Sequence, residues 1–423
     1  MREMKDSGIA WIGAMPRAWK MNTIAQISLQ VKCKNTGLQE KNLLSLSYGK
    51  VKRKSIDTVE GLLPESFDGY NIIEKDDIVL RLTDLQNDHT SLRVGLAEER
   101  GIITSAYLTI RNRSNFCPKY LYYYLHSFDI AKGFYGMGAG VRQGLNWDGV
   151  KWLKILAPSV PEQERIAAFL DAECAEIDAV LEKTRASIEE YKKLKQAVIT
   201  QAVTKGIRGD RPMKNSGIEW IGEIPAEWDV IRNAFLYKEK SRLPEENAVS
   251  LSLSQVDGLI ATDDMKERSL KTSTYDGWKQ VRTNDLVLNR FKGHLGVLFA
   301  ANIEGMVSFH YGVYEPLRQF DSKFFEYLYH SDAYKAILGL KSNGMTIGLQ
   351  NLSNQNFYSV YSLYPPEEEQ QEIIQYLDDK CSGIDALIVQ KQEHFTEIEN
   401  YKKSLIYEYV TGKKEVKTSV LAD

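Results

Sequence analysis

The stretch VPEQERIAAFLDAECAEIDAVLEK (Val160–Lys183) decides the fold, because the chain of 423 residues repeats it near its end as PPEEEQQEIIQYLDDKCSGIDALIVQK (Pro365–Lys391). The Leu-Asp, Cys and Ile-Asp-Ala residues of the two stretches match, and Cys174 becomes Cys381 at an offset of 207. Proline suits the first turn of a helix, and acidic side chains favour its positive end. Each stretch therefore predicts the start of a helix.

Apolar residues step by four and three along both stretches, which is the pattern of a coiled-coil seam. A helix from about Glu162 to Val203 would be roughly 60 Å long at about 1.5 Å per residue. Thr184 and Lys391 occupy one matching seam position, where polar side chains would lower stability but could align the helices. The predicted seam positions are Leu170, Cys174, Ile177, Leu181, Thr184, Ile188, Tyr191, Leu194 and Val198 in the first copy, and Leu377, Cys381, Ile384, Ile388, Lys391, Phe395, Ile398, Tyr401 and Leu405 in the second.

A second repeat opens each half of the chain. MKDSGIAWIGAMPRAW (Met4–Trp19) recurs as MKNSGIEWIGEIPAEW (Met213–Trp228) at an offset of 209. A period close to half of the chain is too long for a solenoid, so it indicates a duplication of one domain and one helix. The predicted boundaries are 1–157 for the first domain, 158–207 for the first helix, 208–364 for the second domain, 365–414 for the second helix and 415–423 for a tail.

Between these repeats, the two halves resemble each other only in short segments. LLSLSYGKV (Leu43–Val51) resembles AVSLSLSQV (Ala248–Val256), and GVRQGLNWD (Gly140–Asp148) resembles GMTIGLQNL (Gly344–Leu352). DDIVL and NDLVLNR predict strands, because β-forming residues follow polar residues that favour turns. YLYYYL and FFEYLYH each fit one short helix packed on a sheet. The variable domains are therefore predicted to be α/β.

The composition is that of an ordinary soluble globular protein, with 43% hydrophobic and 26% charged residues. No apolar run approaches the roughly 18–20 residues needed to span a bilayer, and the N-terminus has no apolar signal region. The four cysteines are scattered without a C-x-x-C pair, which favours a reducing cytoplasm over a disulfide scaffold or a zinc cluster. The net charge of −3 argues mildly against a protein that holds nucleic acid by a bulk positive field.

This layout resembles the DNA-specificity subunit of type I restriction–modification systems. The resemblance rests on S-G-I-x-W-I-G-x-x-P-x-x-W at the start of each domain (Ser7–Trp19 and Ser216–Trp228). It also rests on the proline- and glutamate-rich start and the Leu-Asp…Ile-Asp-Ala core of each helix, and on the Gly-Leu turn of GVRQGL. It covers essentially the whole chain. Any one motif is weak, but the doubled pair in this order is specific.

The resemblance implies two target recognition domains, each reading one half of a bipartite site in double-stranded DNA. A long antiparallel two-helix coiled coil would separate them and set the spacer, so the expected fold is α/β (α+β) with a pseudo-twofold internal duplication. The subunit would have no catalytic activity and no cofactor of its own. It would seat two methyltransferase subunits, which use S-adenosylmethionine, and the complex would recruit restriction and translocase subunits that use ATP and Mg²⁺. Two identical partners would explain why the chain carries two copies of the same segments.

Missing motifs favour a binding protein over an enzyme. FYGMGAG (Phe134–Gly140) imitates a nucleotide-binding loop, but a helix-like aromatic segment precedes it, and no acidic residue is placed as the fingerprint needs. The sequence has no G-x-x-x-x-G-K-[ST] loop, no Asn-Pro-Pro-Tyr-type motif and no H-x-x-x-H pair. Two alternatives stay open: a duplicated coiled-coil adapter that binds proteins without DNA readout, and a self-sufficient methyltransferase, which the missing motifs disfavour.

Candidate DNA-binding residues of the first domain lie in three polar segments. KVKRK (Lys50–Lys54) is either a solvated face or a grip on phosphates. RLTDLQND (Arg81–Asp88) is either an ordinary polar loop or a base-reading segment, because Arg reads guanine and Asn or Gln reads adenine. Gly140–Asn146 is the preferred reading loop, since glycines permit a close backbone approach. The residues predicted to bind DNA are Lys50, Lys52, Arg53, Lys54, Arg81, Gln86, Asn87, Arg142, Gln143 and Asn146.

In the second domain, NRFKGHLG and LKSNGMT supply the candidates. His294 alone is more typical of a structural histidine, and Lys-Ser-Asn-Gly is foremost a turn signal. Thr346 stands where the first domain has Arg142, which we interpret as a different base preference. The residues predicted to bind DNA here are Arg290, Lys292, His294, Lys341, Asn343 and Thr346. The repeated tryptophans are either core residues or a platform for the methyltransferase partner; they are Trp11, Trp19, Trp220 and Trp228.

Overall fold

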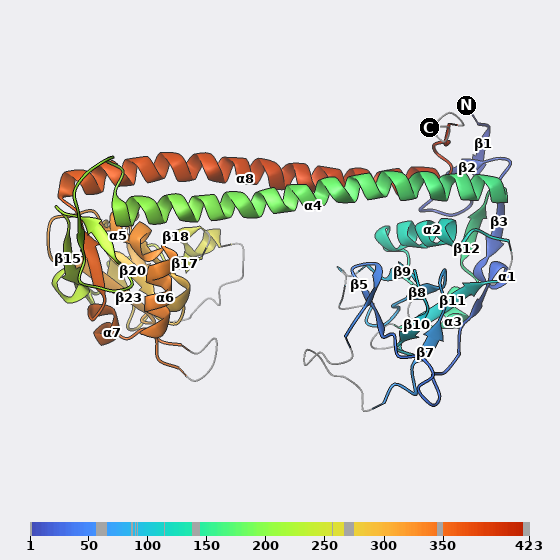
Figure 1. Ribbon diagram of the computed structural model, residues 1–423, viewed down its shortest axis with the longest axis horizontal. Coiled ribbons are helices and arrows are strands. Elements are labelled where there is room, and N and C mark those ends of the chain that lie inside the picture. The colour runs from blue at the N-terminus through green and yellow to red at the C-terminus, as the bar shows by residue number, and fades with distance from the viewer. Residues whose placement is uncertain are drawn as a thin grey trace. The chain divides into compact units, whose positions relative to one another are not determined.

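Two compact units make up the chain in the computed structural model. Unit 1 comprises residues 1–185 and 393–423, and unit 2 comprises residues 186–392. The long helices α4 (Val160–Lys205) and α8 (Glu367–Val410) each contribute a segment to both units (Figure 1). The predicted helix from about Glu162 to Val203 is confirmed. The structure describes residues 2–55, 66–85, 88, 90, 92–113, 115–137, 144–255, 257–265, 275–344 and 350–417.

Unit 1 is built on a four-stranded antiparallel sheet in the order β4–β11–β8–β9, with α2 (Pro118–Ile130) beside β9. Four two-stranded antiparallel ladders surround it: β1–β2, β3–β12, β5–β6 and β7–β10. The strands are β1 (Met4–Asp6), β2 (Ala14–Pro16), β3 (Lys20–Thr23), β4 (Ser28–Gln30), β5 (Leu44–Ser47), β6 (Lys50–Arg53), β7 (Asn71–Ile73), β8 (Ile78–Leu80), β9 (Val94–Leu96), β10 (Gly101–Ile103), β11 (Leu108–Asn112) and β12 (Lys154–Ala157), and the short helices are α1 (Ile24–Ile27) and α3 (Trp147–Val150).

Unit 2 repeats this plan, with a sheet in the order β16–β23–β20–β21 and α5 (Ser322–Tyr329) beside β21. Its antiparallel ladders are β13–β14, β15–β24, β17–β18 and β19–β22. The strands are β13 (Met213–Asn215), β14 (Glu223–Pro225), β15 (Asp229–Arg232), β16 (Tyr237–Glu239), β17 (Leu251–Ser254), β18 (Gly258–Ala261), β19 (Lys279–Val281), β20 (Leu286–Asn289), β21 (Leu298–Ala300), β22 (Gly305–Val307), β23 (Tyr311–Pro316) and β24 (Tyr361–Tyr364); the helices are α6 (Asp332–Leu340), α7 (Asn354–Tyr358) and the short 3-10 turns η1 (Asn233–Phe235), η2 (Thr262–Asp264) and η3 (Gly293–Leu295).

Strand by strand, the two units therefore match, which confirms the predicted duplication and α/β (α+β) class. DDIVL holds β8 and NDLVLNR holds β20, as predicted, and both strands lie in the middle of their sheets. YLYYYL lies in α2 and FFEYLYH in α5, so the predicted aromatic helices are also confirmed. Their aromatic side chains are buried because each helix lies between its sheet and a long helix: the Tyr123 hydroxyl donates to Asp171 in α4 (2.8 Å), and the Tyr327 hydroxyl donates to Asp378 in α8 (2.6 Å).

In unit 1, the segments of α4 and α8 run antiparallel. Phe169 packs against Tyr409 with ring centroids 4.5 Å apart, and the Arg185 guanidinium lies 5.3 Å from the centroid of the Phe395 ring. Residue numbers thus rise along α4 as they fall along α8. Between these contacts, the Lys402 ammonium lies 2.6 Å from the Asp178 carboxylate.

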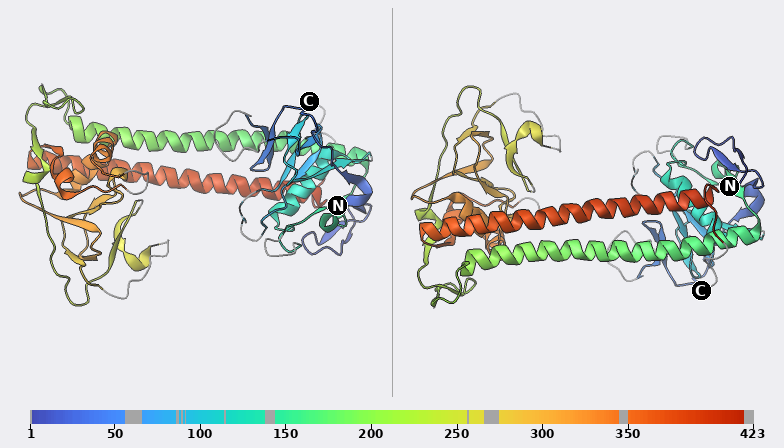
Figure 2. Two further views of the ribbon diagram at one scale, coloured as in Figure 1. Left: turned by 90° about the horizontal axis from the view of Figure 1, so that it is seen from below. Right: turned by 90° about the horizontal axis from the view of Figure 1, so that it is seen from above.

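In unit 2, the same pairing recurs with the helices exchanged. Lys195 in α4 lies 2.6 Å from Asp385 in α8, and these two residues are the repeat counterparts of Lys402 and Asp178. Ile188, Ile384 and Ile388 form a buried apolar cluster with Tyr191 packed against it. The predicted antiparallel pairing is confirmed in each unit, and Figure 2 shows the two helices from opposite sides.

The polar seam residues are satisfied within their own units. The Thr184 hydroxyl donates to the Val180 carbonyl (2.9 Å), and the Lys391 ammonium lies 5.5 Å from the centroid of the Tyr191 ring. Two other predicted seam positions are wrong: Leu194 is 49% exposed and Tyr401 is 55% exposed. An α-helix has 3.6 residues per turn, so a strict 3.5-residue pattern drifts by about 20° per heptad, and the seam has moved to Lys195 and Lys402.

A glutamate joins each domain to the first turn of the long helix that follows it; Glu369 is buried and Glu162 is half-buried. The Trp228 indole N–H donates to Glu369 (2.8 Å), and the Arg211 guanidinium lies 2.7 Å from the same carboxylate and 5.4 Å from the Trp228 ring. In unit 1, the corresponding Trp19 N–H donates to Glu162 (3.2 Å), with Arg2 2.6 Å from this carboxylate. Negative charge near a helix N-terminus is favourable, so the glutamate interacts well with the helix as well as with the domain.

Removal of this carboxylate tests how much the junction stabilises each unit. Glu369→Ala leaves the half-buried Arg211 guanidinium and the buried Trp228 N–H without their acceptor, so we expect the free energy of unfolding of unit 2 to fall by about 3 kcal/mol. Glu162→Ala is the matched control with a smaller expected loss of about 1–2 kcal/mol, because Arg2 also pairs with Glu415 (3.0 Å). Urea unfolding followed by tryptophan fluorescence measures both. Equal stability of both variants and the parent would contradict the assigned role.

Candidate nucleic-acid interface

The β5–β6 hairpin carries the strongest predicted basic cluster on its exposed side. Lys50, Lys52, Arg53 and Lys54 are all exposed. Arg53 forms a two-pronged ion pair with Glu99, with Nε 2.6 Å from Oε1, and this hydrogen bond lowers the pKa of the Glu99 carboxyl. Lys50 lies 3.4 Å from Asp178. Lys52 and Lys54 form no ion pair with another described residue, so their charges remain available to phosphates.

Glycines hold this hairpin against the central sheet. A Cβ on Gly95 in β9 would lie 2.5 Å from the Leu46 side chain and 3.0 Å from Val51, so only glycine permits the observed contact between strand and hairpin. At the turn, a Cβ on Gly49 would lie 3.1 Å from Leu92. The hairpin is therefore packed against the segment that links β8 to β9.

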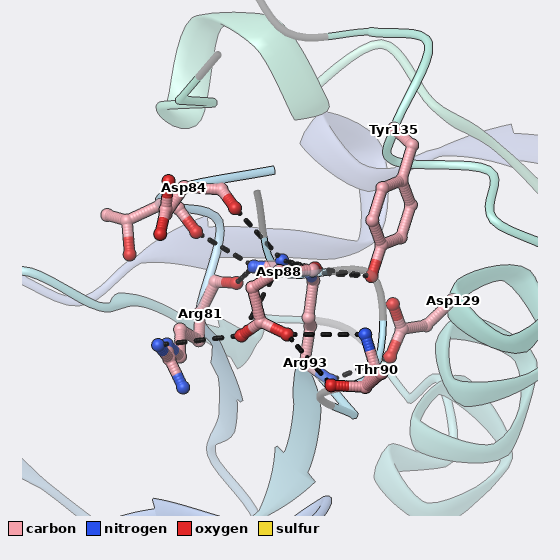
Figure 3. A network of polar contacts seen from close by, with 8 residues as sticks. Arg81, Asp84, Asp88, Thr90, Arg93, Asp129 and Tyr135 are labelled. Atoms are coloured by element: carbon pink, nitrogen blue, oxygen red, sulfur yellow. Dashed lines mark hydrogen bonds and ion pairs between the residues drawn. The ribbon is translucent and has the colours of Figure 1, made fainter. Parts of the chain in front are cut away.

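Arg93 organises the described part of that β8–β9 segment from inside (Figure 3). Its side chain is fully buried, and Nη1 donates to the carbonyls of Arg81 (3.1 Å) and Thr83 (2.8 Å). Nη2 donates to the carbonyls of Asp84 (3.3 Å) and Asp88. A planar guanidinium with five donors can bind several carbonyls at once, which a lysine cannot do. One side chain thus fixes the path of the predicted reading segment.

Two further groups tie this segment to the aromatic helix and the chain after it. The Tyr135 hydroxyl lies 3.1 Å from Arg93 Nε and donates to the Asp88 carbonyl (3.1 Å). The backbone N–H of Arg93 donates to Asp129 Oδ2 (2.7 Å), at the end of α2. Burial raises the pKa of Asp129 to about 6, although Arg93 opposes the shift. The loop is therefore held by hydrogen bonds to groups that are not solvent-exposed.

Of the predicted reading residues in the first domain, Arg81 and Asn146 are described, and Gln86, Asn87, Arg142 and Gln143 lie outside the described residues. Arg81 is partly exposed and lies 3.6 Å from Asp88. Asn146 accepts a hydrogen bond from Gly149 N (3.1 Å) as the N-cap of α3. Next to it, Leu145 N donates to the Leu82 carbonyl (2.8 Å), so the structure brings the end of Gly140–Asn146 to the start of Arg81–Asp88.

Unit 2 has the same backbone hydrogen bond, in which Leu352 N donates to the Arg290 carbonyl (2.9 Å). Leu145 precedes the N-cap Asn146, and Leu352 precedes the N-cap Ser353. Leu145 therefore corresponds to Leu352, and the predicted match of GVRQGLNWD with GMTIGLQNL is out of register by three residues. Short glycine-rich segments of unequal length cannot be aligned reliably from their letters alone.

Predicted residues of the second domain differ in their environment. Arg290 is half-buried, and its Nη2 donates to Glu239 and to Asn354 Oδ1 (2.8 Å); Glu239 also accepts from Lys279 (2.9 Å). Lys292, Lys341 and Asn343 are exposed, and His294 is half-buried. Asn343 pairs through its backbone with Asn351. Thr346 lies outside the described residues, and DNA contact by any of these side chains stays a prediction.

The repeated tryptophans contribute to the core. Trp19 and Trp228 are 3% and 0% exposed, so their indoles serve the junction with the long helices. Trp11 packs 5.4 Å from Tyr124, and Trp220 packs 4.8 Å from Tyr334, both half-buried. Burial favours the packing interpretation, and direct contact with a partner stays a prediction.

A duplicated apolar surface on the long helices was not predicted from the sequence. In unit 1, Val180 is 45% exposed and Tyr401 is 55% exposed; in unit 2, Leu387 is 41% exposed and Leu194 is 49% exposed. Val180 and Leu387 are repeat counterparts, as are Leu194 and Tyr401, each pair at the offset of 207. Each residue directly precedes a seam position. The ion pair of Asp178 with Lys402 shows that Val180 and Tyr401 lie at the same height along the helix pair. We call Val180 with Tyr401, and Leu194 with Leu387, the flank patches.

Arg93 and the flank patches were missed for different reasons. An arginine inside the apolar run Leu92–Leu96 signals burial, but the sequence does not say which carbonyls it binds. The offset of 207, applied to apolar residues outside the seam, would have found the flank patches. Among the described residues, no group of His, Cys, Asp and Glu could hold a metal ion, and no helix is long and apolar enough to cross a membrane.

Two similar domains, each locked to its part of an antiparallel helix pair, define a duplicated module with two candidate reading surfaces. No family model matches the chain. The chain is 23% identical over 429 positions, 96% of each protein, to the "Putative type I restriction enzyme MjaX specificity subunit" of Methanocaldococcus jannaschii.

Two solved structures are similar to this chain. A chain from "Structural basis underlying complex assembly and conformational transition of the type I R-M system" aligns with a TM-score of 0.67 at 14% identity, covering 95% of this chain and 99% of that one. The HsdS subunit from Thermoanaerobacter tengcongensis aligns over 95% of this chain and 98% of its own at 15% identity, with a TM-score of 0.49. The first of these structures shows that the fold is shared, and the predicted resemblance to type I specificity subunits is confirmed.

Proposed function

We propose that this chain is the DNA-recognition subunit of a type I restriction–modification complex. Each unit reads one half of a bipartite site, and the paired helices set the number of unread base pairs between the halves. The observation that carries the proposal is the contrast between shared and unshared parts in a chain similar to a specificity subunit over 96% of its length. Junctions and helix pairing recur residue by residue, whereas the polar loops on the candidate reading surfaces differ.

In this role the subunit contributes recognition and assembly, and it catalyses no step itself. Two methyltransferase subunits bind S-adenosylmethionine and modify adenine, and restriction and translocase subunits use ATP and Mg²⁺. The proposed role puts the chain in the cytoplasm with its DNA. All four cysteines, Cys33, Cys117, Cys174 and Cys381, are free thiols, which suits a reducing compartment.

A slightly acidic net charge is compatible with this role. The chain has a net charge of −3, so it lacks a bulk positive field. Lysines such as Lys52 and Lys54 supply local phosphate contacts, and the methyltransferase subunits supply further positive charge on the same DNA. Phosphate contacts position a protein on DNA, and contacts with base edges give specificity.

Methylation mapping tests the proposal. The chain is co-expressed with a type I methyltransferase subunit that it binds, in cells without other adenine methylation, and methylated adenines are located genome-wide. We expect methylation only when the chain is present, in a sequence of two fixed parts with a constant gap. A contiguous recognition sequence, or methylation that does not depend on the chain, would contradict the proposal.

The flank patches support the seating of two identical partners, because a surface that occurs twice suits a partner that binds twice. Val180→Glu with Tyr401→Glu should leave one methyltransferase subunit bound instead of two, and Leu194→Glu with Leu387→Glu should do the same from the other unit. Val389→Glu is the control, since Val389 is 52% exposed but its repeat counterpart is Glu182. Native mass spectrometry measures the stoichiometry, and two bound subunits in both double variants would exclude the flank patches as docking sites.

A further inference from the structure

Tyr48 is an aromatic residue in a strained position with no structural reason for its presence. It forms the two-residue turn of the β5–β6 hairpin with Gly49, because Ser47 pairs with Lys50. Its φ is +48° and that of Gly49 is +75°. Positive φ at both residues is the requirement of a type I′ turn, for which Asn-Gly is the preferred pair. Tyrosine is a bulky residue for this conformation, so the hairpin would be more stable with asparagine.

The Tyr48 side chain gains nothing from packing. It is 87% exposed, and it makes no ring contact or hydrogen bond with another described residue. Of the seven other described non-glycine residues with positive φ, five are Asp or Asn, whose short polar side chains tolerate this region, and the other two are Leu38 and Lys132. An exposed and strained tyrosine points to a functional contact, because strain persists where function requires it.

The surroundings of Tyr48 identify the partner as DNA. Lys50, Lys52 and Lys54 follow at alternate positions, so they lie on one side of the strand that leads away from the turn. Lysines at this spacing suit the phosphates of one DNA strand. The hairpin is held against its surroundings at the turn, where Gly49 lies close to Leu92, and along β5, where Leu46 lies close to Gly95. The tip is therefore presented in a fixed position.

Tyr48 has no counterpart in unit 2, which favours DNA over the methyltransferase as its partner. In unit 2, the turn between β17 and β18 runs from Ser254 to Gly258 and contains no aromatic residue. Surfaces for two identical partners should occur twice, as the flank patches do. A feature of one unit alone is expected where the two domains read different bases.

We infer that Tyr48 is a further DNA-contacting residue, whose ring enters a groove of the first half-site while Lys52 and Lys54 bind the flanking phosphates. The inference rests on the proposed function, since it names one contact of that recognition surface. An aromatic ring contributes apolar contact with sugars and base edges, and the tyrosine hydroxyl can donate to a phosphate oxygen.

Tyr48→Asn tests the inference, because stability and DNA binding should change in opposite directions. In the complex with methyltransferase subunits, we expect a thermal unfolding midpoint equal to or above that of the parent. Affinity for a duplex with both half-sites should fall at least tenfold. On a duplex in which the first half-site is scrambled, the affinity of Tyr48→Asn should equal the affinity of the parent for that same duplex. Tyr48→Phe keeps the ring and should lose less affinity than Tyr48→Asn.

Leu38→Asn is the matched control in the same domain. Leu38 also has a positive φ of +53° and is 47% exposed, but it has no flanking basic strand. This variant should relieve the same kind of strain without loss of DNA affinity. Unchanged affinity of Tyr48→Asn, or loss of bound methyltransferase with DNA contacts intact, would overturn the inference. If the parent complex bound no bipartite duplex at all, the proposed function itself would fail, and the inference with it.

Discussion

The structure depends on a carboxylate at the first turn of each long helix, fully buried at Glu369 and half-buried at Glu162. Glu162 and Glu369 belong to the helices, whereas the tryptophan and arginine that bind them belong to the opening segment of a domain. A carboxylate buried without these partners would be strongly unfavourable, so the interaction forms completely or the junction opens. It therefore fixes the orientation of each domain on its own segment of the helix pair. It also explains why the opening line of the sequence recurs in the middle of the chain.

Surfaces that occur in both units suit a different role from surfaces that occur in one unit. The junction carboxylates, the ion pairs Asp178–Lys402 and Asp385–Lys195, and the flank patches occur once in each unit. The basic hairpin and the Arg93 network occur in unit 1, and unit 2 instead has Arg290 bound to Glu239. Repeated parts suit assembly with identical partners, and parts found once suit the reading of two different sequences.

Predictions from the sequence were correct where the period of a helix or strand, or the internal duplication, constrained the residues. The helix start, the antiparallel pairing, the strands in DDIVL and NDLVLNR and the paired aromatic helices are confirmed. Most of these features require only amphipathic patterns and repeats, which are local properties of the chain. The antiparallel pairing is different, because it followed from the family resemblance and not from a local pattern.

Prediction failed where tertiary contacts decide the outcome. Leu194 and Tyr401 lie outside the seam, because helical drift accumulates over many turns. Arg290 pairs with the half-buried Glu239 from a distant strand, a contact that the sequence does not show, and its contact with DNA stays a prediction. Arg93 was overlooked because its partners are backbone carbonyls, which every residue carries. Whether a polar side chain faces DNA or the interior depends on such partners.

The claim that paired helices act as the ruler between two reading units is tested most directly by lengthening both. Four residues inserted after Thr184 and four after Lys391 add about 6 Å of helix, which is at most about two base pairs along DNA. Mapping of adenine methylation should then show both half-sequences unchanged and the gap between them longer by one or two base pairs. A gap of the original length, in a complex that still methylates DNA, would contradict the account.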